Sequence, residues 1–232
     1  SNSLSSTYFG QWVDPDLGNF SDDYVGCDVG LSLGYCYNGD ENDEGILGYG
    51  LNPPSVGVDF FEGPKRDTTI NGKDTQIELG MSRFVYYDND FTNFGNPQQP
   101  IHYYNYLRGL WKNGDPLTFD KANGRTGTEP ARYIFPGDTD PDHLGDNWTE
   151  AVAGNTPADR RFLQTSGPFT LKPGAVNKIT VGVVWAKASS GGASGSLELL
   201  KAASRKAQGL FDNCFDILDG PDAPDITYQE LD

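Results

Sequence analysis

Eleven carboxylates precede the first Lys or Arg of the chain, which is Lys65. No His interrupts them, and aromatic and apolar residues such as Trp12, Leu33 and Tyr35 stand between them. Acidic runs without such residues are often disordered tails, so this composition favours a folded segment. A folded segment with this charge repels itself unless something neutralises it. A bound divalent cation would neutralise this charge most simply. Ca²⁺ is suited to the task, because it takes roughly six to eight oxygen ligands from carboxylates, carbonyls and water.

The densest acidic group lies between residues 14 and 28. Alternating Asp14 and Asp16 are typical of the start of an Asp-rich calcium loop, in which Gly18 permits a sharp turn. The closing Glu of an EF-hand is missing, so the loop is of another kind. We expect three further carboxylates to return to the same ion, with the carbonyl of Leu17 or Tyr24 completing the shell. The predicted calcium site comprises Asp14, Asp16, Asp22, Asp23 and Asp28; a solvated acidic turn is the alternative.

Two other acidic clusters stand in turn-rich sequence. Residues 38–45 are typical of a hairpin tip, for which a solvated loop is the better interpretation. Residues 136–142 contain a second candidate metal site, formed by Asp138, Asp140 and Asp142. Both clusters combine carboxylates with Gly or Asn, so each is compatible with a loop around an ion or with a solvated turn.

The cysteines and two sequons give further candidate modification sites. Cys27 and Cys36 lie on either side of a short run with two glycines, and a hairpin would bring them together as a disulfide. The alternative is a pair of reduced, half-buried thiols. Cys214 lies on the expected inner face of a helix and is interpreted as a core residue. Asn19 and Asn147 stand in Asn-x-Ser/Thr sequences and are candidate glycosylation sites.

Hydrophobic periodicity predicts a mainly β fold with a β-sandwich-like core and two helices. The second helix is expected to pack on the sheet. Strands are expected at 7–13, 29–37, 55–61, 81–87, 160–166, 167–171 and 177–186, the last in a central position because of its apolar run. Asn71-Gly72 indicates a hairpin turn. Helices are expected at 102–111 and 197–215. Residues 1–219 form one predicted module, and Gly/Pro-rich residues 220–232 are interpreted as a linker toward a further domain.

The net charge and the absence of known motifs argue against several classes of function. A net charge of −16 argues against nucleic acid and against an anionic membrane surface. No apolar run is long enough to cross a membrane, so no membrane insertion is expected. The sequence lacks a zincin motif, a nucleophile elbow and a phosphate-binding loop. We therefore expect no enzyme, although abundant carboxylates leave glycoside hydrolysis open. Five aromatic residues could line a sugar-binding face or belong to the core: Tyr103, Tyr104, Tyr106, Trp111 and Trp148.

A set of short motifs spans nearly the whole chain, at residues 14–18, 22–28, 34–40, 48–50, 53–57, 104–109, 135–138, 159–162, 166–171 and 207–213. Together they resemble uncharacterised modules of large secreted and cell-surface proteins of Bacteroidetes, of the kind exported by the type IX secretion system. Such modules often precede fibronectin-like domains and a C-terminal sorting domain, which suits a linker at 220–232. Where relatives end the helix with Asp-Asn-Asn-Phe, this chain has Cys214, which the resemblance leaves without a role.

The sequence and the resemblance together predict a calcium-stabilised structural or adhesive module, located outside the cell or on its surface and belonging to a multidomain adhesin or fibre. Ca²⁺ is the expected cofactor. The expected partners are other domains of the same polypeptide, neighbouring subunits and glycans. The alternative is a carbohydrate-binding or carbohydrate-processing module of a secreted polysaccharide-degrading protein. A deep acidic cleft flanked by Trp or Tyr would favour this alternative, whereas a filled Asp cage without a cleft would favour the structural module.

Overall fold

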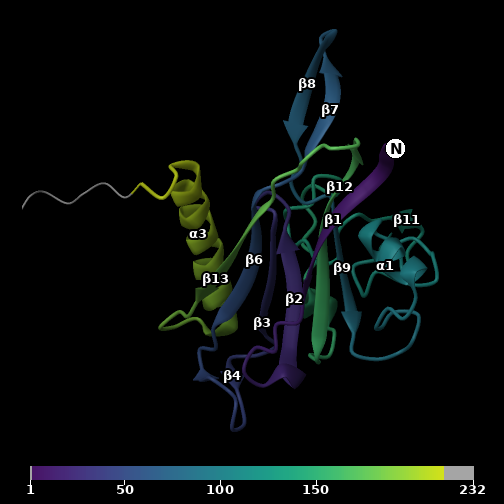
Figure 1. The fold of residues 1–232 in the computed structure, drawn as a ribbon. Coiled ribbons are helices and arrows are strands. Elements are labelled where there is room, and N and C mark those ends of the chain that lie inside the picture. The colour runs from purple at the N-terminus through teal and green to yellow at the C-terminus, as the bar shows by residue number, and fades with distance from the viewer. Residues whose placement is uncertain (1, 217–232) are drawn as a thin grey trace, which may run out of the picture.

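Two antiparallel sheets form the centre of the molecule, with helices α3 and α1 on opposite sides of the pair (Figure 1). The computed structural model describes residues 2–216, so the predicted linker at 220–232 lies outside the described residues. The prediction of a mainly β fold with a C-terminal helix packed on a sheet is confirmed. The described residues contain a third, short helix that the sequence pattern did not predict.

The four-stranded sheet has the order β13-β6-β3-β2. Its strands are β2 (Asp23–Asp28), β3 (Leu33–Asn38), β6 (Ser55–Glu62) and β13 (Thr180–Ala186). Strand β2 falls in the segment predicted as part of a metal loop, and all its residues are buried. Residues 29–32 form the turn into β3 rather than the start of a strand. The predicted central position of 177–186 is wrong, because β13 is an edge strand that pairs with β6 alone.

The three-stranded sheet has the order β1-β12-β9. Its strands are β1 (Leu4–Val13), β9 (Arg83–Asp88) and β12 (Arg160–Leu171). The two strands predicted at 160–166 and 167–171 are one continuous strand, which passes through Pro168 and pairs with β1 along most of its length. Because β1 and β12 are antiparallel, the start of β12 lies opposite the end of β1, and the carboxylate cluster described below stands at this junction.

The main core lies between the two sheets. Phe84 and Phe162 on the three-stranded sheet are buried and tilt against each other, with ring centroids 5.2 Å apart. Gly34 of β3 faces them, and a Cβ at this position would lie 2.6 Å from the Phe162 ring and 2.3 Å from Gln164 Oε1. The absence of a side chain therefore lets the sheets approach closely at this point.

Helix α3 (Gly192–Asp212) covers the other face of the four-stranded sheet. Leu197 and Leu200 are buried with Leu33, Tyr35 and other residues of the strands below. The helix begins and ends earlier than the predicted 197–215. Cys214 therefore follows the helix and is exposed, so its interpretation as a core residue is wrong. None of the helices formed by residues 2–216 combines the length and apolarity needed to span a membrane.

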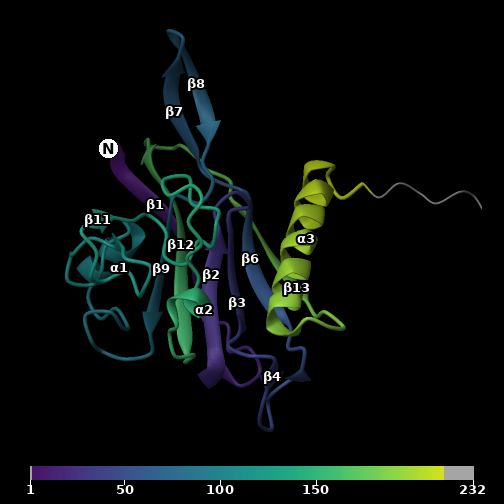
Figure 2. The same cartoon turned by 180° about the vertical axis from the view of Figure 1, so that it is seen from behind.

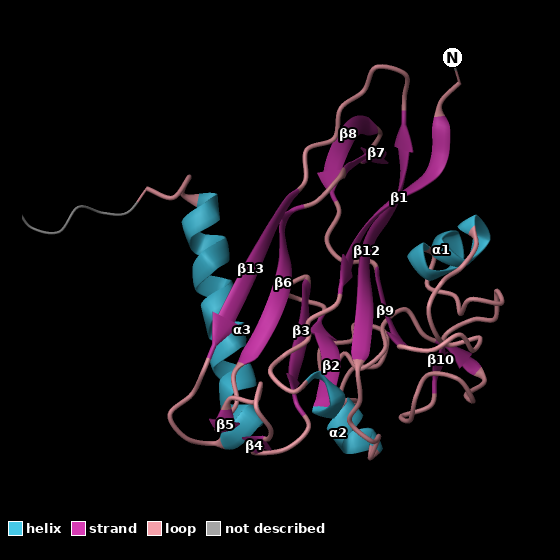
Figure 3. Cartoon of the chain, turned by 60° about the horizontal axis from the view of Figure 1, so that its bottom comes forward, coloured by secondary structure: helices cyan, strands magenta, loops and turns pink. Residues whose placement is uncertain are grey.

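Smaller elements surround the sheets. The hairpin of β7 (Lys65–Ile70) and β8 (Lys73–Glu78) projects from one end, and its Asn71-Gly72 turn, with both φ angles positive, confirms the prediction (Figure 2). The pair β4 (Asn42–Asp43) and β5 (Gly50–Leu51) lies at the opposite end, near the start of α3 (Figure 3). Helix α2 (Glu150–Ala153) packs against β2, helix α1 (Pro100–Leu107) lies beside the three-stranded sheet, and a 3₁₀ turn spans Phe20–Asp22. The pair β10 (Thr118–Phe119) and β11 (Glu129–Pro130) completes the set.

Candidate functional site

A groove of about 500 Å³ lies between the outer face of the three-stranded sheet and α1. Its sheet side is formed by Gly10 and Trp12 of β1, Leu163 of β12 and Tyr87 of β9, and its helix side by Tyr103, Tyr106 and Leu107. Asn96 and Pro97, which precede α1, close one edge. A Cβ at Gly10 would lie 2.3 Å from Leu107, so the absence of a side chain lets α1 sit close to β1.

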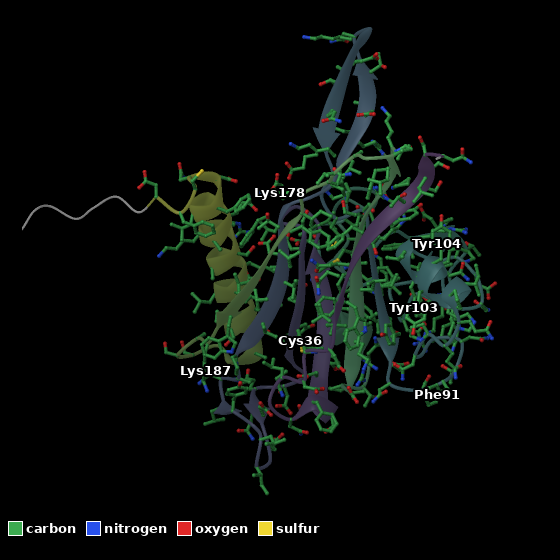
Figure 4. The ribbon with its side chains drawn as sticks, viewed as in Figure 1. Cys36, Phe91, Tyr103, Tyr104, Lys178 and Lys187 are labelled. Atoms are coloured by element: carbon green, nitrogen blue, oxygen red, sulfur yellow. The ribbon has the colours of Figure 1, made fainter. Side chains whose placement is uncertain are left out.

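The aromatic rings of the groove are held in fixed orientations. Tyr87 and Tyr106 are buried and stack with an interplanar angle of 8° and centroids 5.3 Å apart. Trp12 Nε1 donates a hydrogen bond to the Tyr87 hydroxyl, and the Tyr106 hydroxyl donates to the Gly95 carbonyl at 2.6 Å. Trp12 and Tyr103 are 50% and 55% exposed, so each presents ring surface to solvent. Figure 4 shows Tyr103 and Tyr104 on α1.

A cluster of three carboxylates stands where β1 ends and β12 begins. Asp14, Asp16 and Asp159 each place a carboxylate oxygen within 4.8 Å of the others, close enough to share a metal ion. Arg161 bridges two of them, with contacts of 3.1 Å to Asp14 and 2.7 Å to Asp159. Burial raises the pKa of Asp14, and the Arg161 charge opposes that rise. Asp14 Oδ1 has no hydrogen-bond partner among residues 2–216.

The carboxylate cluster and the groove are connected. Asn96 at the edge of the groove donates its amide to Asn89 at 2.9 Å, and Asn89 donates to Asp159 at 2.8 Å. Tyr87 pairs directly across the strands with Arg161, which holds the cluster. The groove therefore has an aromatic body, and Asn96 at its edge is joined through Asn89 to the carboxylate cluster, whose residues lie outside the lining of the groove.

The structure brings together only two of the five Asp residues predicted to bind one calcium ion. Asp23 and Asp28 stand at opposite ends of β2, about 16 Å apart at the rise of an extended strand. Asp22 is occupied by amide donors from Asn19 and Asn38. The prediction that all five bind one ion is therefore wrong, because residues 23–28 form a strand instead of returning in a loop.

Backbone N–H groups stabilise several acids of the N-terminal segment, two of which were predicted calcium ligands. Asp23 accepts from the Leu17 N–H at 3.1 Å, and Asp28 from the Leu31 N–H at 3.1 Å. Asp43 is buried and accepts from two backbone N–H groups. Burial raises the pKa of Asp23 to about 8, so this carboxyl group is largely protonated and neutral at pH 7. Part of the expected charge is thus absent from the folded segment.

The second predicted metal site is also dispersed. Asp140 is buried, accepts from the Asp142 N–H at 2.9 Å and contacts His143 Nδ1 at 3.0 Å. Asp142 pairs with Arg132, which lowers its pKa, and Asp138 is exposed. These three carboxylates are not among the described residues close enough to share an ion, so the structure does not support a metal site there.

The predicted Cys27–Cys36 disulfide is wrong, since both thiols are free and buried. The hairpin forms, but its register places Cys27 opposite Gly34 and Cys36 opposite Val25. The two cysteines are therefore diagonal neighbours, for which Cα atoms lie roughly 7–8 Å apart, farther than most disulfides span. Cys36 is fully buried, and Figure 4 labels it among the central strands.

The Asn side chains of the two sequons differ in solvent exposure. Asn147 is exposed. Asn19 is half-buried, and its amide nitrogen donates to Asp22 at 2.9 Å. Glycosylation at either position stays a prediction.

Sequence reasoning found part of the groove and missed the rest. Of the five aromatic residues proposed as a sugar-binding face, Tyr103 and Tyr106 line the groove, whereas Trp111 and Trp148 are buried in the core. Trp12, Tyr87 and Asp159 were not assigned to a site. Asp14 comes just after β1 and two residues after Trp12, a short spacing that could have linked them. Asp159 gave no such signal, because its proximity depends on the pairing of β1 with β12.

Comparison with protein-family models, with curated proteins and with solved structures finds no match to this chain.

Proposed function

We propose that this chain is a calcium-stabilised adhesive module of a secreted or cell-surface protein, with other domains or neighbouring subunits as its partners. The observation that carries the proposal is the cluster of Asp14, Asp16 and Asp159 at the junction of β1 and β12. Three carboxylate oxygens within reach of one point suit a hard divalent cation, and backbone carbonyls and water would supply the remaining ligands. The extracellular location rests on the resemblance to exported Bacteroidetes modules.

Calcium at this cluster would act on the architecture of the module. Asp14 and Asp16 follow an edge strand, and Asp159 precedes the central strand of the same sheet. One ion would join the two strands where they meet and would also neutralise carboxylates that Arg161 alone cannot balance. The expected consequence is a more stable sheet and a more rigid end of the groove. No catalytic step is assigned to these carboxylates.

Thermal unfolding in Ca²⁺ and in excess EGTA tests the calcium proposal. At a Ca²⁺ concentration of about 100 times Kd, binding to the native state adds about 2.7 kcal/mol. For a chain of this size that corresponds to a rise in Tm of roughly 5–10 °C. We expect Asp16→Asn to abolish the rise, because it removes one of the three carboxylates of the cluster. Asp16 is exposed, so the substitution should leave the fold intact.

Asp138→Asn is the matched control, since it removes the same charge from the other predicted metal loop, at an exposed position. It should leave the calcium-dependent rise intact. A Tm that is equal in Ca²⁺ and EGTA, or a rise that survives in Asp16→Asn, would contradict calcium binding at this cluster.

A further inference from the structure

We propose that the groove between β1 and α1 binds a neutral glycan, with a pyranose ring stacked on Trp12 and Tyr103. The inference rests on the adhesive function proposed above and names the chemistry of its partner. A volume of about 500 Å³ falls within the roughly 300–1,000 Å³ of small-molecule sites. The groove also combines exposed ring faces with polar groups at one end, and a sugar has complementary C–H faces and hydroxyl edges.

The aromatic rings are ordered before any ligand binds. Trp12 is fixed by its hydrogen bond to Tyr87, and Tyr87 is fixed by its stack on Tyr106. The Tyr103 hydroxyl lies 3.4 Å from the Pro97 carbonyl, a long contact that restrains this ring less than the other two. Binding therefore requires little ordering of Trp12 and Tyr87, and the exposed faces of Trp12 and Tyr103 are available for stacking.

The hydrogen-bond donors of the groove are occupied, which disfavours an extended peptide as the ligand. A proline-rich peptide docks on aromatic grooves and presents backbone carbonyls, which require donors from the groove. Here the Trp12 N–H and the Tyr103 and Tyr106 hydroxyls are already directed to groups within the protein. What remains in the body of the groove is ring surface, which suits the apolar face of a pyranose.

The charge around the groove selects among glycans. Three carboxylates and one guanidinium form the cluster beyond Asn96 and Asn89, and the whole chain has a net charge of −16. This negative field disfavours a ligand with uronate or sulfate groups. An uncharged glycan fits both the exposed ring faces and the charge of the chain.

The test is titration of the protein with cellohexaose, xylohexaose and a polygalacturonate oligomer. Calorimetry and tryptophan fluorescence monitor the binding. We expect saturable binding of at least one neutral hexasaccharide and no binding of the acidic oligomer. Trp12→Ala and Tyr103→Ala should each weaken binding about tenfold or more, as is typical of aromatic anchors. Trp185→Ala is the matched control, because Trp185 is 52% exposed but lies on β13 of the other sheet.

Circular dichroism and Tm establish that each variant is folded, and Tyr103→Ala keeps the Trp12–Tyr87 hydrogen bond. Failure of both neutral hexasaccharides to bind, or an equal loss in Trp185→Ala, would overturn the proposal. Binding of a proline-rich peptide at Trp12 in their place would reassign the groove. Titrations in Ca²⁺ and in EGTA separate the two proposals. Sugar binding without a calcium-dependent rise in Tm would support the glycan groove and contradict the calcium cluster. A calcium-dependent rise in Tm without sugar binding would support the calcium cluster and contradict the glycan groove.

Discussion

The buried carboxyl group of Asp59 gives a sharp test of how this acidic chain accommodates its charge. Asp59 lies on β6 beneath α3, is 1% exposed and accepts a hydrogen bond from the Ser204 hydroxyl. Its other oxygen has no partner, and the carboxyl group forms no ion pair, among residues 2–216. Burial raises its pKa from 3.8 to about 6, the Ser204 hydrogen bond opposes the rise, and the Asp28 charge adds to it.

The raised pKa converts into a loss of stability at high pH. Because the folded pKa lies above the unfolded one, the stabilisation is complete below pH 3.8 and is lost as the pH rises through about 6. Each pKa unit corresponds to about 1.4 kcal/mol, so the ceiling is about 3 kcal/mol. A cavity of about 250 Å³ beside Asp59 is large enough to hold water, which would screen the charge. We therefore expect a loss of about 1–2 kcal/mol.

Asp59→Asn removes the charge and keeps an acceptor for Ser204. We expect the variant to exceed the parent in free energy of unfolding by about 1–2 kcal/mol at pH 8 and to match or fall slightly below it at pH 4. Urea denaturation at pH 4, 6 and 8 in EGTA, followed by tryptophan fluorescence, measures both. Ser204→Ala is the opposite control, which removes the donor and keeps the charge, and it should lose most stability at pH 8. A variant-to-parent difference that stays constant from pH 4 to 8 would refute the reasoning.

Two further predictions concern the core. Arg160 forms a salt bridge of 3.0 Å with Glu150, which is 0% exposed. Arg160→Ala should lower the free energy of unfolding by about 3–5 kcal/mol, because it leaves the buried Glu150 without its ion-pair partner. An unchanged urea midpoint would contradict this. In the native protein a thiol reagent such as DTNB should modify Cys214 alone, and Cys27 and Cys36 only after unfolding, since burial shields both and raises the pKa of each thiol. Rapid native modification of all three would disagree with the buried hairpin.

Local patterns in the sequence were sufficient for several elements. The segment predicted at 55–61 is β6, the segment predicted at 81–87 is β9, and the Asn71-Gly72 turn joins β7 to β8. Each signal lies within a short window, where alternation or turn chemistry determines the local conformation. The C-terminal helix was also predictable, because its apolar residues keep helical spacing along one face.

The pairing of distant segments decided the candidate sites. Asp159 meets Asp14 and Asp16 only because β12 lies beside β1, and Trp12 and Tyr103 line one groove only because α1 lies against that sheet. No spacing along the chain encodes such contacts, since they depend on sheet order and register.

The sequence by itself determined that this is a folded, strongly acidic, mainly β chain, because composition and short-range periodicity carry that information. Only the tertiary structure decided how the acids are accommodated. Backbone N–H groups bind Asp23 and Asp43, burial raises the pKa of Asp23 so that it keeps its proton at pH 7, and one cluster at the end of β1 retains the geometry for an ion. The reason is physical: the free energy of a carboxylate depends on the donors and the solvent around it, and folding supplies both from remote parts of the chain.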